Sequence, residues 1–200
     1  IQTIKNIRNI EDCTAENPFT LIYVSTIDLY KHQWNVIDIV IELVNEGMNL
    51  ELILIGSYYL PAYKKMMSKI RLLDPNNKYI KYKGPLPFKD LKEYYLKSDL
   101  SIFASTCENM PNILLESMSY KIPILSSNKS PMPEILGNSG LVCDFENLKQ
   151  AKNIMSKIIK SSKLRKKFSR NGSILANKYD WKTCSRKTFN FLESIHDQND

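Results

Sequence analysis

The sequence lacks most features that membrane, metal and redox proteins require. No segment approaches the roughly 18 consecutive apolar residues of a membrane span, and the first ten residues, IQTIKNIRNI, lack the apolar run of a signal peptide. The two histidines and four cysteines are scattered and form neither a C-x-x-C pair nor a zinc-site spacing. We therefore expect no cofactor and no metal, and four idle thiols in a reducing cytoplasm.

Glycine is also scarce, and its positions exclude two common nucleotide-binding motifs. The chain has six glycines, and none of them form G-x-G-x-x-G or G-x-x-x-x-G-K-[ST]. These motifs let backbone amides approach a pyrophosphate or a triphosphate closely. Their absence argues against a dehydrogenase with an ordinary dinucleotide fingerprint and against a P-loop nucleotide triphosphatase.

Acidic residues are absent from residues 147–179, although the same segment carries ten lysines and arginines. Such a run can face nucleic acid or an anionic membrane. It lacks the regular interleaving of aromatic residues that would stack bases, so we expect no nucleic-acid partner. A solvated helix face is the favoured interpretation, and peripheral contact with the inner face of a membrane stays open.

The pattern that is present predicts an α/β fold. The chain has 200 residues, 43% of them hydrophobic and 24% charged, which suits one domain with a sizeable core. Apolar strand-like runs alternate with helical periodicity: strands are expected at 21–25, 50–55, 79–82, 100–104, 122–126 and 141–143, and helices at 34–45, 63–73, 88–97, 112–120 and 133–136. This alternation predicts a Rossmann-like parallel sheet of about six strands with helices on both faces.

Three parts follow along the chain. Residues 1–19 show no firm period and are interpreted as a linker or lead-in segment. Residues 20–180 carry the alternating pattern of the main domain. Residues 181–200 are expected to form a terminal helix and tail. Ligands of open α/β sheets bind beyond the carboxyl ends of the strands, so the loops after the strands are where a site is expected.

The loop and helix at 105–116, S-T-C-E-N-M-P-N-I-L-L-E, are the richest of these segments. Unpaired amides in the first turn of a helix, together with the helix dipole, form a natural anion site. Glu116 lies one turn further in, where a carboxylate can accept hydrogen bonds from paired hydroxyls such as those of a ribose. Glu108 precedes the helix and can reach a sugar above the phosphates. From spacing alone, two ordinary solvated glutamates are an equally good interpretation.

Two weaker candidates lie on the same edge of the predicted sheet. Lys31 follows the first strand, where it can neutralise a phosphate as a point charge. Glu134 begins the short helix after the stiff loop 128–134, where it can serve as a helix cap or contact a ligand.

The segment Glu108-Asn109-Met110-Pro111-Asn112-Ile113-Leu114-Leu115-Glu116 resembles the E-x7-E motif of retaining glycosyltransferases of family 4, the glycosyl transferases group 1. The resemblance extends from about residue 20 to residue 181. It includes the phrases LIYVSTIDLYKHQ, LELILIGS, YKGPLPFKDLKEYYLKSDLSIFAS and SPMPEILGNSGLV, in the order that the family has them.

This resemblance implies the C-terminal, donor-binding domain of a GT-B fold, in which two Rossmann-like domains face each other across a cleft. By similarity, Glu116 would bind the ribose hydroxyls, Glu108 would contact the transferred sugar, and Lys31 would neutralise the diphosphate. Glu108 and Lys31 would be the catalytic residues, and no metal would be needed. The other expected substrate-binding residues are Asn109, Met110, Pro111, Asn112 and Ile113 near the diphosphate, Ser25 and Thr26 after the first strand, and Gly84 and Pro85 near the base.

The implied activity is hexosyl transfer, with retention, from a nucleotide diphosphate-sugar to a glycan or lipid-linked acceptor in polysaccharide biosynthesis. The sequence departs from the family where Ser25-Thr26 replaces the usual G-R, so diphosphate binding would rest more heavily on Lys31. Nothing resembles the N-terminal acceptor domain. We therefore expect this part alone to bind donor weakly and to transfer little or no sugar.

Two other functions stay open. One is a non-catalytic nucleotide-sugar-binding module, and the other is a sugar epimerase or phosphorylase of the same fold. The terminal helix resembles the family's closing helix, which crosses back to the N-terminal domain. Without that partner domain, its apolar side chains are expected to be partly exposed: Phe189, Phe191, Leu192 and Ile195.

Overall fold

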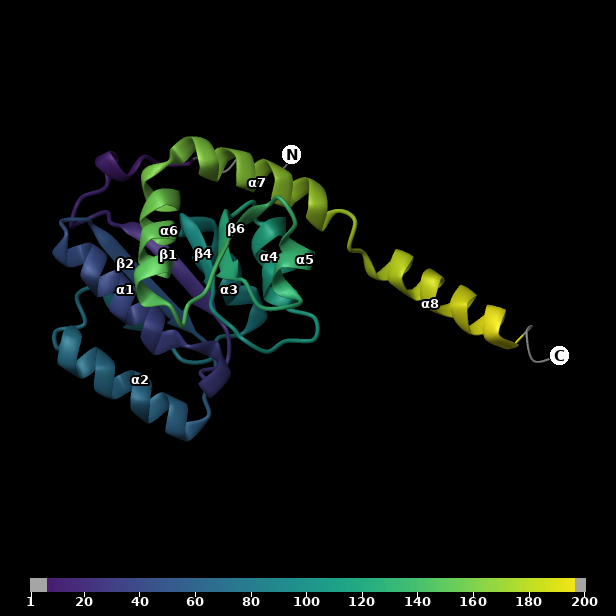
Figure 1. Cartoon of the computed structure of the whole chain (residues 1–200), viewed down its shortest axis with the longest axis horizontal. Helices are drawn as coiled ribbons and strands as arrows, with labels where there is room; N and C mark the ends of the chain where they lie inside the picture. Colours follow the sequence, from purple (N-terminus) through teal and green to yellow (C-terminus); the bar gives the residue numbers. More distant parts are fainter. Residues whose placement is uncertain (1–6, 197–200) are drawn as a thin grey trace.

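The computed structural model describes residues 7–196, which build a parallel β-sheet with helices on both faces (Figure 1). The strands are β1 (Phe19–Val24), β2 (Leu50–Ile55), β3 (Ile80–Tyr82), β4 (Leu100–Phe103), β5 (Ile124–Ser127) and β6 (Gly140–Cys143). They lie in the order β3-β2-β1-β4-β5-β6, and all neighbouring pairs are parallel. The six-stranded Rossmann-like sheet predicted from the sequence is confirmed.

Helices connect successive strands and continue after the last one. They are α1 (Gln33–Asn45), α2 (Leu60–Leu73), α3 (Phe88–Lys97), α4 (Asn112–Ser119), α5 (Met132–Leu136), α6 (Leu148–Lys160), α7 (Ser162–Ala176) and α8 (Trp181–His196), with short 3-10 turns η1 (Ile10–Asp12) and η2 (Leu29–Lys31). Helix α1 packs against α2 and α6, and α4 packs against α7.

Proline chemistry explains two boundaries that differ from the expected ones. Helix α2 begins at Leu60, three residues earlier than expected, because Pro61 occupies its first turn, where no amide is needed. Strand β5 begins at Ile124, two residues later than expected, because Pro123 has no N–H to donate to the ladder.

Both faces of the sheet are buried, as the continuous apolar strands require. Along β1, Leu21 and Tyr23 point into the larger core, which includes the apolar face of α1. Ile22 and Val24 point the other way, into a smaller core that includes Tyr95 of α3. Burial of each large aliphatic side chain contributes roughly 1.5–3 kcal/mol, so both faces stabilise the sheet.

The lead-in segment packs at the amino edge of the sheet, where the strands begin. The Arg8 guanidinium is paired with the buried carboxylate of Asp99, which also accepts the Thr20 amide at 2.8 Å. Arg165 of α7 is fully buried at the same edge, and its guanidinium carbon lies 4.8 Å from the centre of the Phe19 ring.

The basic segment 147–179 is largely a solvated surface, as favoured from the sequence, with Arg165 as a buried member. Arg165 donates to the carbonyls of Ile158 and Ile159 at the end of α6 and to the carbonyl of Arg8. Burial lowers the pKa of this guanidinium. Its sequence neighbours Lys166 and Lys167 are exposed.

Helix α8 projects away from the rest of the molecule (Figure 1). Trp181 is 84% exposed, and Phe189, Phe191, Leu192 and Ile195 are also exposed, which confirms the expected apolar surface. Among residues 7–196, no helix combines the length and apolarity needed to cross a membrane.

Candidate functional site

The strand order reverses between β1 and β4, the two strands at the middle of the sheet. In open α/β sheets this switch point leaves a crevice beyond the carboxyl ends of the strands, and ligands bind there. The loop after β1 carries Ser25, Thr26 and Lys31, and the loop after β4 carries Glu108. The sequence-predicted residues of these two loops therefore lie at the position where the topology favours a site.

Lys31 and Glu108, the two predicted catalytic residues, form an ion pair across the switch point. Their side chains are only 9% and 15% exposed, so water screens the pair weakly. The Lys31 ammonium also lies 5.1 Å from the ring centres of both Tyr30 and Phe103. The cation is thus held between two aromatic rings with one carboxylate as its ionic partner.

Tyr23 joins the loop after β1 to the loop after β4, a role that the sequence reasoning missed. Its hydroxyl donates to the Lys31 carbonyl at 2.6 Å and accepts the Ala104 amide at 3.1 Å. The ring is buried in β1, and burial raises the pKa of the phenol, so the hydroxyl stays protonated. A tyrosine in an otherwise apolar strand was the signal for a buried hydrogen-bonding role.

A second set of contacts joins the same loops nearer to solvent. The Thr106 amide donates to the Tyr30 carbonyl at 2.8 Å, and the Thr106 hydroxyl lies 3.1 Å from Nε2 of His32. His32 has a φ of 51° and precedes α1, and burial lowers the pKa of its imidazole. These contacts hold the backbone on both sides of the Lys31–Glu108 pair in place.

Ser25 and Thr26 are held by Gln33, a side chain that the sequence reasoning did not single out. Gln33 is fully buried, and its Nε2 donates to the Ser25 hydroxyl and to the Thr26 carbonyl, each at 3.0 Å. Its Oε1 is buried and has no hydrogen-bond partner among the described residues. The next strand approaches closely here, since a Cβ on Gly56 would lie 2.0 Å from the Ser25 carbonyl oxygen.

Gly84 and Pro85, predicted to lie near a base, follow β3 at the same edge of the sheet. Gly84 has a φ of 69°, and its carbonyl accepts the Gly56 amide at 2.9 Å. This contact joins the loop after β3 to the loop after β2. Pro85 is exposed.

The predicted anion site at the start of α4 has no side-chain cap. The Asn112 amide donates to the Met110 carbonyl and the Leu114 amide to the Pro111 carbonyl, both at 2.9 Å. Within the described part of the chain, the Ile113 amide has no acceptor. Asn109, Met110 and Asn112 are exposed, whereas Pro111 is buried. Fewer amides are available than the sequence suggested, because the Asn112 and Leu114 amides are already bonded to backbone carbonyls.

Glu116 lies apart from the Lys31–Glu108 pair, on the side of α4 that faces α3. Its Oε2 accepts the Tyr95 hydroxyl at 3.1 Å. Burial raises the pKa of Glu116, and the hydrogen bond from Tyr95 partly opposes this rise.

Glu116 lines an open cavity of about 750 Å³ between α4 and the start of α8. From α4 and the turn before it, the lining includes Met110, Asn112, Leu115 and Ser119. From residues 178–187, which include the start of α8, it includes Lys178, Tyr179, Asp180, Trp181, Thr183, Cys184 and Lys187. The predicted site residues therefore fall into three groups: one at the switch point, one along α4, and Gly84 and Pro85 after β3. Met110 and Asn112 line the same cavity as Glu116.

The loop at 128–134 forms an ion pair with the segment after β6. The Lys129 ammonium lies 3.4 Å from Asp144, and Glu134 in the first turn of α5 is exposed. Among residues 7–196, no three His, Cys, Asp or Glu side chains are grouped so as to hold a metal ion.

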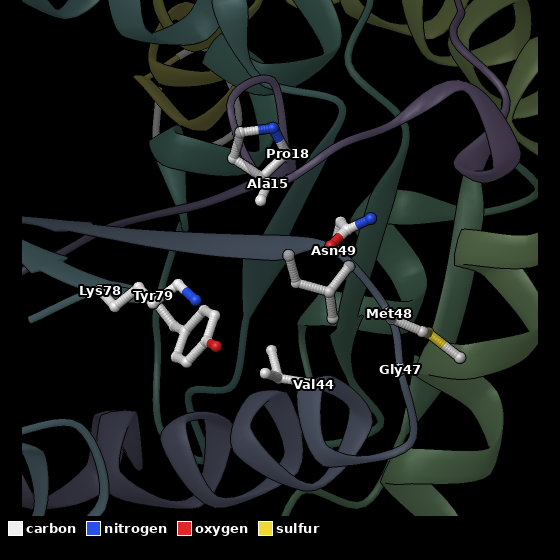
Figure 2. Close-up of a pocket in the computed structure, with 9 residues that line it drawn as sticks. Ala15, Pro18, Val44, Gly47, Met48, Asn49, Lys78 and Tyr79 are labelled. Atoms are coloured by element: carbon white, nitrogen blue, oxygen red, sulfur yellow. The ribbon is translucent and has the colours of Figure 1, made fainter.

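A smaller cavity of about 120 Å³ lies at the opposite, amino edge of the sheet (Figure 2). Its lining comes from the lead-in segment, the turn between α1 and β2, and the start of β3: Ala15, Pro18, Val44, Gly47, Met48, Asn49, Leu50, Lys78 and Tyr79. None of the predicted site residues line it, so it is not part of the candidate site.

Proteins of similar sequence include known glycosyltransferases. The family model described as glycosyl transferases group 1 matches residues 6–174. The O-antigen chain mannosyltransferase B of Escherichia coli is 27% identical over 112 residues, which cover 56% of this chain and 29% of that protein. The amylovoran biosynthesis glycosyltransferase AmsD of Erwinia amylovora is 30% identical over 84 residues, 42% of this chain and 24% of that protein.

Solved structures agree on the fold. Anabaena Alr3699/HepE in complex with UDP and glucose superposes with a TM-score of 0.80 at 20% identity, over 90% of this chain and 49% of that one. The C-terminal domain of the glycosyl transferase group 1 family protein LpcC from Francisella tularensis gives a TM-score of 0.70 at 21% identity, over 80% of this chain and 86% of that one. The chain spans less than half the length of the curated relatives it matches.

Proposed function

The chain belongs to the family of glycosyl transferases group 1, and on that premise we propose that it is the C-terminal, donor-binding domain of a retaining glycosyltransferase. The enzyme would move a hexose from a nucleotide diphosphate-sugar to a glycan or lipid-linked acceptor in polysaccharide biosynthesis. The C-terminal placement draws support from the superposition on an isolated C-terminal domain of the same family. The acceptor site would come from an N-terminal domain across the cleft.

The observation that carries the proposal is the buried Lys31–Glu108 pair at the switch point of the sheet. A buried cation there is suited to the diphosphate of a donor, because low local polarity strengthens its attraction for phosphate. The start of α4, with its uncapped first turn, adds the positive end of a helix dipole. Glu116, one turn further along α4, is suited to the ribose.

In this proposal, catalysis is mainly electrostatic. Negative charge grows on the diphosphate as the bond to the sugar breaks, and Lys31 and the Ile113 amide at the start of α4 stabilise that charge. Glu108 leaves Lys31 when the diphosphate arrives and then contacts the transferred sugar. These groups supply the positive charge themselves, so we propose that no metal is required.

We place the enzyme in the cytoplasm, where its acceptor would be assembled. All four cysteines are free thiols, and Cys107 and Cys184 are exposed, an arrangement typical of a reducing compartment. The exposed lysines of α6 and α7 are available for weak contact with anionic lipids at the inner face of the membrane.

Calorimetric titration of this chain with UDP, GDP and a few nucleotide-sugars tests the proposal. Saturable binding of one nucleotide is expected, with Lys31→Ala and Glu116→Ala each weakening it by about tenfold or more. Lys129→Ala, which removes a lysine paired with Asp144 at the same edge of the sheet, is the matched control and should leave binding unchanged.

Equal weakening by Lys31→Ala and Lys129→Ala would contradict the assigned site. A folded chain that binds no nucleotide at millimolar concentration would favour a module whose donor site has been lost. Release of free sugar or epimer from a nucleotide-sugar, without any acceptor, would favour an epimerase or phosphorylase.

A further inference from the structure

We propose that Tyr95 is a positioning residue for Glu116: its hydroxyl holds one carboxylate oxygen, so that the other is presented to a pair of neighbouring hydroxyls on a ligand. The inference relies on the proposed donor function for the identity of the ligand, a ribose diol. The contact between the two residues is independent of that function.

Tyr95 is held rigidly, which a positioning residue requires. Its side chain is fully buried in the smaller core on the α3 face of the sheet. Its ring stacks on Tyr120 with centres 5.0 Å apart and an angle of 15° between the planes. The hydroxyl therefore cannot follow Glu116 if that side chain moves, and Glu116 must instead adopt the rotamer that meets Tyr95.

The hydrogen bond divides the carboxylate into two ends. Oε2 accepts the Tyr95 hydroxyl at 3.1 Å, while the side chain as a whole borders the cavity between α4 and α8. A carboxylate offers about four acceptor positions, so one bond to Tyr95 leaves enough for two donors from a diol. A ligand diol would then meet a carboxylate whose orientation is already fixed, which reduces the entropy lost on binding.

The hydrogen bond from Tyr95 also affects whether Glu116 is charged. A diol donates both hydrogen bonds, so Glu116 must be charged to accept them. Burial raises the pKa of Glu116, and the Tyr95 hydrogen bond lowers it again. The other charged groups that border the cavity are Lys178 and Asp180, just before α8, and Lys187 within α8. Removing the phenol hydroxyl should therefore leave Glu116 protonated at a higher pH.

The first test needs no ligand. Carboxyl carbon chemical shifts of the ¹³C-labelled chain are followed by NMR through a pH titration, and the Glu116 signal is assigned by its loss in Glu116→Gln. Tyr95→Phe keeps the ring and its stacking but removes the hydroxyl, and it should move the Glu116 midpoint to higher pH. Tyr120→Phe, the stacked neighbour, is the matched control and should leave the midpoint in place. An unchanged midpoint in Tyr95→Phe would overturn the proposal, whatever the chain binds.

The second test measures whether Tyr95 contributes to binding of the ribose diol. Whichever of UDP or GDP binds the wild type is compared with its 2′,3′-dideoxy analogue by calorimetry. Tyr95→Phe should weaken binding of the ribonucleotide by about tenfold and leave binding of the dideoxy analogue unchanged. A merely structural role would weaken both ligands equally, and that result would overturn the proposal.

The two tests also separate this inference from the donor function. A shifted midpoint together with no binding of any nucleotide would refute the donor function and the diol, and would leave the coupling of Tyr95 to Glu116 established. A shifted midpoint with loss confined to the ribonucleotide supports both.

Discussion

Arg165 and Lys31 are both buried cations, but they lie at opposite edges of the sheet and are held by different kinds of partner. Arg165, at the amino edge, donates to backbone carbonyls of Ile158, Ile159 and Arg8. Lys31, at the carboxyl edge, is paired with the side chain of Glu108, which belongs to a loop without regular structure. Backbone carbonyls cannot leave without unfolding the helix end, whereas a glutamate can rotate away.

The hydrogen-bond partners of the polar groups near Arg165 and near Lys31 can be compared in the same way. At the amino edge, the buried Asp74 carboxylate accepts three amides, two from the turn before β3 and one from Ile80 at its start, each at 2.8 Å. At the carboxyl edge, Gln33 Oε1 and the Ile113 amide have no partner within residues 7–196. Buried polar atoms without a partner occur at both edges, because Arg165 Nε and Ser139 Oγ, just before β6, also lack one among the described residues. The edges differ instead in what holds the buried cation: backbone carbonyls at the amino edge and the Glu108 carboxylate at the carboxyl edge. We therefore expect changes at Arg165 and Asp99 to act on stability, and changes at Lys31 and Glu108 to act on nucleotide binding.

Arg165→Met should give the largest effect and should affect stability alone. The change leaves the carbonyls at the end of α6 buried without donors, so the free energy of unfolding should fall by roughly 2–4 kcal/mol. Urea denaturation measures the change, and Arg170→Met, an exposed position on the same helix, should cost less than about 0.5 kcal/mol. Weaker nucleotide binding by the folded Arg165→Met protein would break the proposed division between the edges.

Asp99→Asn should come next, with a loss of about 2–3 kcal/mol in the free energy of unfolding. The carboxylate pairs with the Arg8 guanidinium and accepts the Thr20 amide, and an amide side chain cannot satisfy both. The Arg8 side chain is 23% exposed, so water partly compensates the lost pair. Asp90→Asn, an exposed position on α3, serves as the control in the same denaturation series. A loss equal to that of the control would show that the lead-in segment contributes nothing to the fold.

Glu108→Gln should act in the opposite direction on binding, although it should also lower stability because it leaves the buried Lys31 ammonium without its ionic partner. The amide is the same size but carries no charge, so Lys31 is released for the phosphates. Free UDP or GDP, which has no sugar for Glu108 to contact, should bind about two- to fivefold more tightly. Calorimetry against the wild type measures this change. Weaker binding would show that Glu108 supports the diphosphate and does not compete with it, which would contradict the exchange of partners at Lys31.

The sequence predicted which strands and helices follow one another along the chain and the edge of the sheet at which a site would lie. Both predictions were possible because hydrophobic periodicity and loop chemistry are local signals. It placed Lys31 and Glu108 on that edge, but it could not show that they pair, since 77 residues separate them. Tyr23 and Tyr95 were missed for the same reason, because Ala104 and Glu116 lie 81 and 21 residues away from them. Gln33 bonds Ser25 and Thr26, only eight and seven residues away, but a glutamine in the first turn of a helix is an ordinary residue and gave no signal.

The smallest expected effect is a pH dependence of stability from His32, which stands beside the Lys31–Glu108 pair. Burial lowers the pKa of its imidazole in the folded chain. The unfolded chain therefore binds a proton more readily, and stability should be lost as pH falls from the ordinary histidine pKa of about 6.5 through the folded value. Thermal unfolding at pH 7 and pH 5 measures this loss, and His32→Gln should reduce it. An equal loss in His32→Gln would contradict this assignment and would attribute the pH dependence to the carboxylates.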